Sequence, residues 1–302
     1  MSILITGGAG FVGGHVVGEL KRQYPSEKII ALSSNKIEGT QTVPSRNYNF
    51  DERYLLDNGC GDVEVIIHIG AWIPKMAKEA SDFVQATSNI ASSERLLVSC
   101  LPKLKKIIYC STLDVYGDAE EAITEETSVA PQSMYGWSKL YCEKMIESFA
   151  HEKNITVQIL RLGHIYGEGE EKYCKAMPVM IENAVHGRDI VIYGDGEAIR
   201  TFIYIEDVAK AVVNAVRLEV SGLINVVGNE PVTINQLADM IVAYSGEQVK
   251  IQHILTDTTN RKCLFDNQHL RACLLGELTP FGKGLRNEID YIKRQMRHEY
   301  HI

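Results

Sequence analysis

The chain opens with Ile3-Leu4-Ile5-Thr6-Gly7-Gly8-Ala9-Gly10-Phe11-Val12-Gly13, an apolar run that leads into spaced glycines. The run predicts a buried strand, and the residues after the glycines predict a helix over 11–23. In that context a G-x-G-x-x-G loop allows a tight turn, a close approach of its backbone to a pyrophosphate, and close packing of helix on strand. The helix N-terminus adds N–H donors and a positive dipole. The stretch therefore predicts a dinucleotide site, with a plain glycine-rich turn as the alternative.

Strand-like and helix-like segments alternate along the first half of the chain. This alternation predicts a Rossmann-like, doubly wound α/β fold, in which helices cover both faces of a parallel sheet. Runs such as Val65-Ile66-Ile67 lack polar alternation, as expected of strands that are buried on both faces. We expect strands at Ser2–Thr6, Lys28–Leu32, Val65–His68, Lys106–Cys110 and Thr156–Leu162, and helices at Phe11–Gln23, Ser81–Leu101 and Met134–Lys153.

The pattern changes after Gly167, where a polar, glycine-containing stretch is followed by shorter, mixed segments. Thr201–Ala215 predicts a strand and then a helix, and Gly222–Val227 predicts another strand; we expect these to rejoin the first sheet. Residues 1–167 plus about 201–229 would then form the dinucleotide-binding domain. The remainder, 168–200 plus about 230–302, would form a smaller mixed α/β C-terminal substrate lobe.

Bulk composition narrows the function classes for this chain of 302 residues. Its formal net charge of −8 argues weakly against a nucleic-acid partner, because such proteins usually carry a basic face. No apolar run reaches the roughly 18 residues of a membrane span. The seven cysteines are scattered, without a Cys-x-x-Cys pair or a Cys/His metal spacing. We therefore expect reduced thiols, a cytoplasmic location and no metal site.

Tyr135 and Lys139 fall on one face of the helix expected over 134–153, because residues i and i+4 are neighbours on a helix. A phenol has a pKa of about 10, and a nearby ammonium favours its ionised form, so the pair can donate or accept a proton. Thr112, at a strand end, could hydrogen-bond the same substrate oxygen. Alone, a Tyr-x-x-x-Lys pair is incidental more often than not; together with the glycine loop it predicts a catalytic set.

The second expected strand ends in Ser33-Ser34-Asn35-Lys36, where dinucleotide-binding folds usually place a carboxylate for the ribose 2′-hydroxyl. Hydroxyls, an amide and a lysine suit a 2′-phosphate better than a carboxylate would. We therefore expect NADP, with NAD as the other possibility. The alternative is an exposed turn in which Ser and Asn serve turn geometry alone.

With these motifs in place, the chain resembles extended short-chain dehydrogenases/reductases of the NAD-dependent epimerase/dehydratase family. The resemblance runs nearly end to end. Besides the segments above, it rests on His68-Ile69-Gly70-Ala71, Asn89, Ser111–Gly117, Arg161–Gly167, Tyr193-Gly194-Asp195-Gly196 and Arg200–Val208.

Because that family usually acts on a nucleoside-diphosphate sugar, the resemblance implies that the smaller lobe binds such a sugar. It implies that Arg200 grips the diphosphate and that Arg261 is a second such arginine, since guanidinium groups offer paired donors to phosphate; surface salt bridges are the alternative. In addition to the residues at the end of the second strand, the expected cofactor-binding residues are Gly7, Gly10, Phe11, Val12, Asn49, Phe50, Ile69, Gly70, Ala71, Tyr135 and Lys139.

Two departures from the family pattern bear on the reaction. The family's sugar 4,6-dehydratases carry an Asp-Glu pair after the catalytic Thr, where this chain has Leu113-Asp114. Leu113 cannot transfer a proton, so dehydration would lack its acid, while Asp114 either contacts the sugar or braces the loop. His164 stands where Asn is common, either as a proton relay against the substrate or as a structural histidine.

The resemblance implies hydride transfer at the sugar's C4, with Thr112, Tyr135 and Lys139 as the catalytic residues. The missing carboxylate favours a reductase of a 4-keto-6-deoxy sugar, which is our expectation; a 4-epimerase is the alternative. A non-catalytic redox sensor is the alternative of another class, although a sensor would not need all three residues.

The resemblance also implies a homodimer formed by the helices near 89–101 and 134–151. The apolar stripe of the second helix is Met134, Leu140, Met145, Ile146 and Phe149, which could equally face the protein's own sheet.

Overall fold

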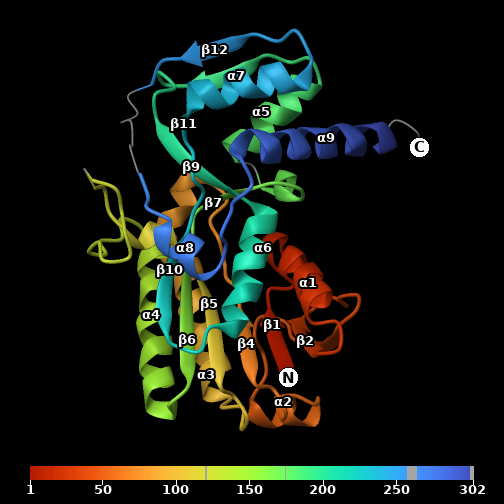
Figure 1. Cartoon of the computed structure of the whole chain (residues 1–302), viewed down its shortest axis with the longest axis vertical. Coiled ribbons are helices and arrows are strands. Elements are labelled where there is room, and N and C mark those ends of the chain that lie inside the picture. The colour runs from red at the N-terminus through yellow and green to blue at the C-terminus, as the bar shows by residue number, and fades with distance from the viewer. Residues whose placement is uncertain (120, 174, 257–263, 300–302) are drawn as a thin grey trace.

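The computed structural model describes residues 1–119, 121–173, 175–256 and 264–299, and its largest element is a seven-stranded parallel sheet (Figure 1). The spatial order of the strands is β10 (Gly222–Val226), β6 (Thr156–Leu162), β5 (Lys106–Thr112), β4 (Val65–His68), β1 (Ser2–Thr6), β2 (Lys28–Ser33) and β3 (Gln41–Pro44). From β1 the chain adds β2 and β3 on one side. It then crosses back to the other side of β1 and adds β4, β5, β6 and β10 there. The expected Rossmann-like architecture is confirmed.

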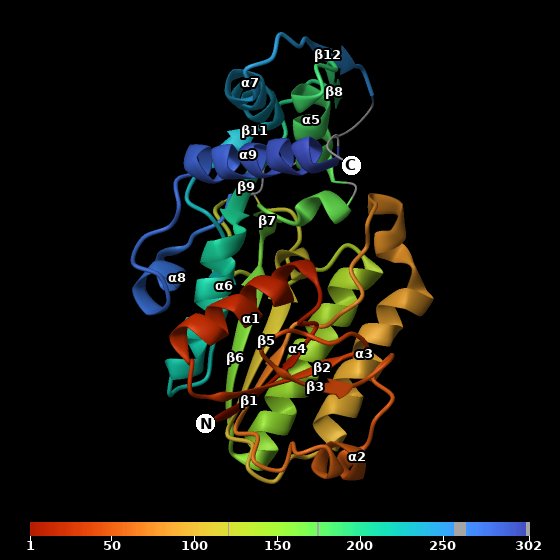
Figure 2. The same cartoon turned by 90° about the vertical axis from the view of Figure 1, so that its right-hand side faces the viewer.

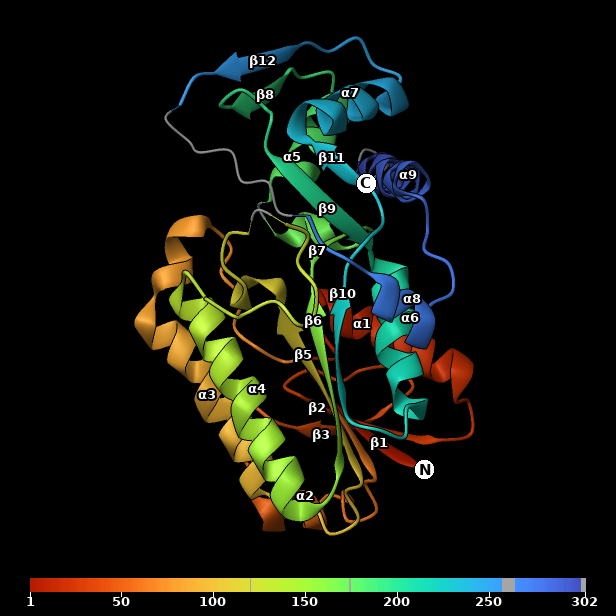
Figure 3. The ribbon, with the colours of Figure 1, turned by 60° about the vertical axis from the view of Figure 1, so that its left-hand side comes forward.

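Helices cover both faces of this sheet, and the strand residues serve the two faces in turn (Figure 3). Ile3 and Ile5 enter the core beneath the helices α1 and α6, while Leu4 enters the core beneath α3 and α4. Apolar residues at successive positions are therefore needed, because each face buries every second side chain. The helices of this part are α1 (Phe11–Gln23), α2 (Glu52–Asp57), α3 (Phe83–Val98), α4 (Met134–Lys153) and α6 (Ile205–Asn214).

The remaining elements, except for α8 beside β10, lie beyond the end of the large sheet at which β6 continues into β7 (Figure 1, Figure 2). One hydrophobic core runs from beneath α1 and α6 into α5, α7 and α9 without a break. The strands here are β7 (His164–Tyr166), β9 (Ile199–Tyr204) and β11 (Pro231–Thr233) in one sheet, and β8 (Ile190–Tyr193) and β12 (Ile251–Ile254) in another. The helices are α5 (Ala176–Val185), α7 (Ile234–Ser245), α8 (Gln268–Cys273) and α9 (Phe281–Glu299).

Most expected segments of the first half match within two or three residues, but one expectation about the second half is wrong. The segment 222–226 does join the large sheet, beside β6. The strand predicted at the start of Thr201–Ala215 is part of β9. It does not join the large sheet, because β9 pairs with β7 and β11. The reason is that β7 leaves the large sheet after Gly163 and offers β9 a parallel partner outside it. The proposed division into domains near 167 and 229 stays a prediction.

None of the helices within the described ranges is long and apolar enough to cross a lipid bilayer. The five cysteines of that part of the chain are free thiols, at positions 60, 100, 110, 142 and 273.

The glycine loop connects β1 to α1 through contacts that exclude side chains. Gly7 has a φ of +72°, in the left-handed region. A Cβ on Gly13 would lie 2.0 Å from the carbonyl oxygen of Gly7. The same carbonyl accepts a hydrogen bond from the backbone N–H of Gly10, at 2.9 Å. The helix can therefore approach the strand this closely only because position 13 has no side chain.

We expect Gly13→Ala to lower the free energy of unfolding by roughly 1–3 kcal/mol, because the added methyl overpacks the turn. Gly18→Ala is the matched control on the same helix, where a Cβ would meet nothing within 4 Å. That change should raise stability by up to about 1 kcal/mol through helix propensity. Chemical denaturation of both variants measures the difference, and equal effects would contradict the packing account.

Candidate active site

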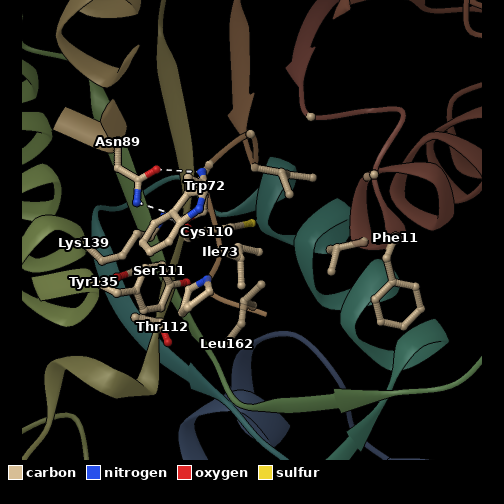
Figure 4. A pocket seen from close by; sticks show the side chains of 18 of the residues that line it. Phe11, Trp72, Ile73, Asn89, Cys110, Ser111, Thr112, Tyr135, Lys139 and Leu162 are labelled. Atoms are coloured by element: carbon tan, nitrogen blue, oxygen red, sulfur yellow. Dashed lines mark hydrogen bonds between the residues drawn. The ribbon is translucent and has the colours of Figure 1, made fainter. Parts of the chain in front are cut away.

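A cavity of about 1050 Å³ lies where the carboxyl ends of β1, β4 and β5 face β7 and β9. Figure 4 shows Trp72, Thr112, Tyr135 and Lys139 gathered on one side of it, with Phe11 on the other. The expected cofactor residues that line it are Gly7, Gly10, Phe11, Val12, Ser33, Ser34, Ile69, Gly70, Ala71, Tyr135 and Lys139. The expected substrate residues that line it are Asp114, His164 and Arg200.

Four residues expected at the cofactor site do not line the cavity: Asn35, Lys36, Asn49 and Phe50. The backbone N–H of Asn35 donates to the Ser33 hydroxyl at 3.1 Å, an arrangement typical of a local turn. The Phe50 side chain is buried in the core beneath α3 and α4. Arg261, the second expected diphosphate ligand, lies outside the described residues.

Tyr135 stands in the first turn of α4, at a helix start that its neighbours determine. Ser133 caps the helix by accepting a hydrogen bond from the backbone N–H of Gly136, at 3.1 Å. A Cβ on Gly136 would lie 2.4 Å from the carbonyl oxygen of Asp114, so this glycine lets the 3₁₀ turn after β5 pack directly on α4. The turn and the phenol are thereby held side by side.

Burial controls the acidity of the Tyr135 phenol, which is 6% exposed. Loss of solvation raises its pKa well above the ordinary value, and the nearby Asp114 carboxylate raises it further. A hydrogen bond with Thr112 acts in the opposite direction. Thr112, at the end of β5, therefore shares with Tyr135 the point where a substrate hydroxyl could be held.

Lys139 lies one turn further along α4, and its ammonium contacts strand β5. It donates to the carbonyl oxygen of Cys110 at 2.7 Å, and it lies 4.2 Å from the centre of the Tyr109 ring. Burial lowers the pKa of Lys139 to about 8. Burial is the largest influence on the pKa of the phenol, and the expectation that this ammonium lowers that pKa stays a prediction.

The loop after β4 continues past the predicted Ile69, Gly70 and Ala71 into Trp72, which the sequence did not predict at the cavity. The side-chain amide of Asn89 accepts from the backbone N–H of Trp72 at 2.7 Å and donates to its carbonyl at 3.1 Å. The Trp72 indole is thereby held edge-on to the Tyr135 ring, with the ring centres 6.1 Å apart (Figure 4). Of Asn89 and Trp72, only Asn89 was named from the sequence, as part of the family resemblance and without a role. We call the pair of hydrogen bonds from Asn89 to Trp72 the Asn89 clamp. Ile73, Pro74, Tyr48, Arg95, Leu162, Tyr173, Lys175 and Phe265 also line the cavity and were not expected.

Arg200 and Lys175 bring positive charge to the part of the cavity wall around His164. His164 pairs in register with Phe202 on β9, two residues from Arg200 and on the same face. The His164 ring is open to the cavity, yet the surrounding protein together with Arg200 and Lys175 lowers its pKa to about 4. His164 is therefore neutral near pH 7, and Arg200 supplies the permanent charge that an anionic ligand requires.

The backbone and side chains at the glycine-loop end of the cavity fit a dinucleotide. Gly7 and Gly70 approach each other so closely that a Cβ on Gly7 would lie 2.6 Å from the backbone N of Gly70. The loops after β1 and β4 therefore form a backbone-lined cradle at the point where the strand order reverses, as expected for dinucleotide sites. No carboxylate from the end of β2 lines the cavity; Ser33 and Ser34 do.

The profile of the NAD dependent epimerase/dehydratase family matches residues 3–228. An uncharacterized UDP-glucose epimerase of Bacillus subtilis is 28% identical over 270 residues, which cover 83% of this chain and 84% of that protein. The solved UDP-glucose 4-epimerase of Thermotoga maritima, with UDP-glucose, has a TM-score of 0.86 at 26% identity and covers 98% of this chain and 100% of its own. The UDP-glucuronic acid 4-epimerase of Bacillus cereus, with UDP-glucuronic acid and NAD, has a TM-score of 0.85 at 26% identity and equal coverage.

A buried ion pair supports β5 and β6 beneath this cavity. The Arg161 guanidinium, on β6, donates to both carboxylate oxygens of Glu143 on α4, at 3.0 and 2.7 Å. Glu143 is 0% exposed, and it also accepts a hydrogen bond from the hydroxyl of Ser111, next to Thr112. The strand end that presents Thr112 is therefore tied to the helix that presents Tyr135.

We expect Glu143→Ala to lower the free energy of unfolding by about 3–5 kcal/mol, because Arg161 is left charged, buried and unpaired. Glu147→Ala serves as the control, since it removes the exposed partner of Lys144 one turn along the same helix. Its effect should stay within roughly 0.5 kcal/mol. Urea denaturation of both variants tests this, and a Glu143→Ala cost as small as the control's would refute the supporting role.

Proposed function

This chain belongs to the NAD dependent epimerase/dehydratase family, and on that premise we propose that it is a 4-epimerase of a nucleoside-diphosphate hexose. One observation carries the proposal: Thr112, Tyr135 and Lys139 line the same cavity as the glycine loop. Proton transfer and hydride transfer can then act on one carbon. The relatives named above support the choice of reaction, because each is named as an epimerase of a UDP-sugar.

In this proposal the chain's own residues bind the sugar and move its hydroxyl proton. Thr112 orients the C4 hydroxyl, and Tyr135 takes its proton and later returns it. Lys139 holds the cofactor ribose with the N–H donors that Cys110 leaves free, and Arg200 binds the diphosphate. A bound nicotinamide dinucleotide would supply reversible hydride transfer at C4. Leu113 cannot donate a proton, which leaves dehydration without its acid.

A 4-keto-6-deoxy sugar reductase is the second candidate, and one observation favours it. Ser33 and Ser34 line the adenosine end of the cavity without a carboxylate, which suits NADP and therefore a cofactor that exchanges between turnovers. The solved UDP-glucuronic acid 4-epimerase of Bacillus cereus holds NAD, which gives the preference for NADP no support. We therefore rank epimerisation with NAD first.

We expect the purified protein to interconvert UDP-glucose and its C4 epimer, with no net change in reduced nicotinamide. Tyr135→Phe should lower turnover by roughly 10²–10⁴-fold, because the proton acceptor is lost. The dissociation constant for UDP-glucose should change little. Product analysis by chromatography and calorimetric titration measure the two quantities.

Parallel incubations with a UDP-4-keto-6-deoxyhexose and NADH or NADPH distinguish the alternatives. Stoichiometric oxidation of either reduced cofactor, without epimerisation of UDP-glucose, would establish the reductase and identify its cofactor. A native protein that binds dinucleotide but turns over neither sugar, with Tyr135→Phe indistinguishable from it, would be the non-catalytic sensor.

We also propose that two copies of this chain pair through the outer faces of α3 and α4, which lie side by side (Figure 3). The stripe Met134, Leu140, Met145, Ile146 and Phe149 does not form this face: Leu140 and Ile146 are buried, and Met145 and Phe149 pack on the core beneath. Five other apolar side chains of these two helices are exposed instead, at 64%, 75%, 67%, 52% and 57%: Phe83, Val84, Val98, Trp137 and Tyr141. Large exposed apolar faces of this kind commonly mark interfaces.

We expect the native chain to sediment as a dimer in analytical ultracentrifugation. The double variant Trp137→Glu/Tyr141→Glu should sediment as a monomer, because charges are costly in an apolar interface. Tyr193→Glu is the matched control, since Tyr193 is 69% exposed on β8, away from both helices. A native monomer, or a double variant that stays dimeric, would exclude this face.

A further inference from the structure

Two groups of β5, the carbonyl of Cys110 and the ring of Tyr109, hold the ammonium of Lys139 in a position that no sequence motif indicated. We call these two groups the ammonium seat. The nitrogen of Lys139 lies 2.7 Å from the carbonyl oxygen of Cys110 and 4.2 Å from the centre of the Tyr109 ring. Lys139 is 2% exposed and Tyr109 is 1% exposed, so both groups are removed from bulk water. Cys110 is the one hydrogen-bond acceptor that this ammonium reaches among the residues that the structure describes.

We propose that Tyr109 is a positioning residue, whose ring holds the Lys139 ammonium at the cavity wall in the place where it can meet the cofactor ribose. This inference rests on the proposed function for its effect on turnover. The predicted effect of Tyr109 on dinucleotide binding is independent of the proposed function, because this binding can be measured without a sugar substrate.

An aromatic face is well suited to this task in a dry site. An ammonium has three donors, and a buried ammonium with unmet donors is costly. The Tyr109 ring attracts the charge through its quadrupole without taking a hydrogen bond, and this attraction is strongest where water is excluded. The ring therefore fixes the ammonium while leaving N–H groups for a ligand. A second carbonyl in that place would hold the charge but would also use up a donor.

The Tyr109 ring packs against His68, whose hydrogen bonds connect it to the strand that precedes the glycine loop. The His68 ring lies 5.4 Å from the Tyr109 ring. One nitrogen of His68 bonds the Thr6 hydroxyl at 2.7 Å, and the other bonds the Ser93 hydroxyl at 2.9 Å. Burial lowers the pKa of His68 to about 3, so it adds no charge near the ammonium. Thr6 also accepts from the backbone N–H of Gly70, in the dinucleotide cradle.

The charge of the Lys139 ammonium depends on pH, and this dependence can be tested. Burial lowers the pKa of Lys139 to about 8, so the charged form prevails below that pH and is lost above it. The titratable groups around it come from three elements: Tyr109 and Cys110 on β5, Tyr135, Cys142 and Glu143 on α4, and His68 on β4. Glu143 is already paired with Arg161, and burial raises the pKa of Cys110 to about 12.

Three variants separate the ammonium seat from ordinary core packing. Tyr109→Leu removes the aromatic face, and Tyr109→Phe keeps it without the hydroxyl. Ile107→Ala makes a cavity two residues earlier on the same strand, in the same core and on the same side of the sheet, without touching Lys139. Each variant is checked for folding by its thermal unfolding before the other measurements.

We expect Tyr109→Leu to weaken NAD binding about tenfold in calorimetric titration, while Tyr109→Phe and Ile107→Ala stay close to the native value. In turnover, the alkaline limb of the pH profile should move to lower pH for Tyr109→Leu only, because the ammonium loses its aromatic partner and is deprotonated more easily. kcat should fall more than KM changes.

Equal losses in Tyr109→Leu and Ile107→Ala would overturn the proposal, because they would reduce Tyr109 to a packing residue. A Tyr109→Phe variant as impaired as Tyr109→Leu would also overturn it, since the hydroxyl and not the ring would then matter. If the native protein turns over no sugar, the proposed function fails, but the NAD titrations still decide the role of Tyr109.

Discussion

The reversal of strand order between β1 and β4 is the constraint on which the rest of this structure depends. Because all seven strands are parallel, their carboxyl ends meet at one edge, and the reversal opens a crevice there. The glycine loop follows β1, the Gly70 loop follows β4, and Thr112 ends β5. Residues that are more than a hundred positions apart thus line one cavity, because the parallel sheet alone brings their strand ends together.

Within that cavity, burial does more than charge pairing to determine the chemistry. The phenol of Tyr135 and the ammonium of Lys139 are both almost fully enclosed, which raises the pKa of the first and lowers that of the second. Burial thus disfavours the charged form of both groups, the phenolate and the ammonium. The structure binds the ammonium to β5 rather than to the phenol, so the two groups serve different partners from one helix.

The sequence predicted the parts of this arrangement that depend on local pattern. Strands such as β1 and β4 are largely continuous apolar runs, and the positions of Thr112, Tyr135 and Lys139 follow from short motifs. It did not predict contacts that depend on long-range register. The Asn89 clamp on Trp72, the ammonium seat and the pairing of β9 with β7 each join segments whose proximity no periodicity encodes. Asn35 and Lys36 do not line the cavity and a local turn accounts for Asn35, so their role at the cofactor ribose stays a prediction.

A crystal structure of the chain with NAD and UDP-glucose tests the central claim most directly. The account predicts the Tyr135 hydroxyl within hydrogen-bond reach, about 2.6–3.2 Å, of the C4 oxygen, with that carbon facing the nicotinamide ring. It also predicts Lys139 in contact with both Cys110 and a ribose hydroxyl. A sugar bound with C4 turned away from Tyr135, or a nicotinamide outside the cradle of Gly7 and Gly70, would contradict it.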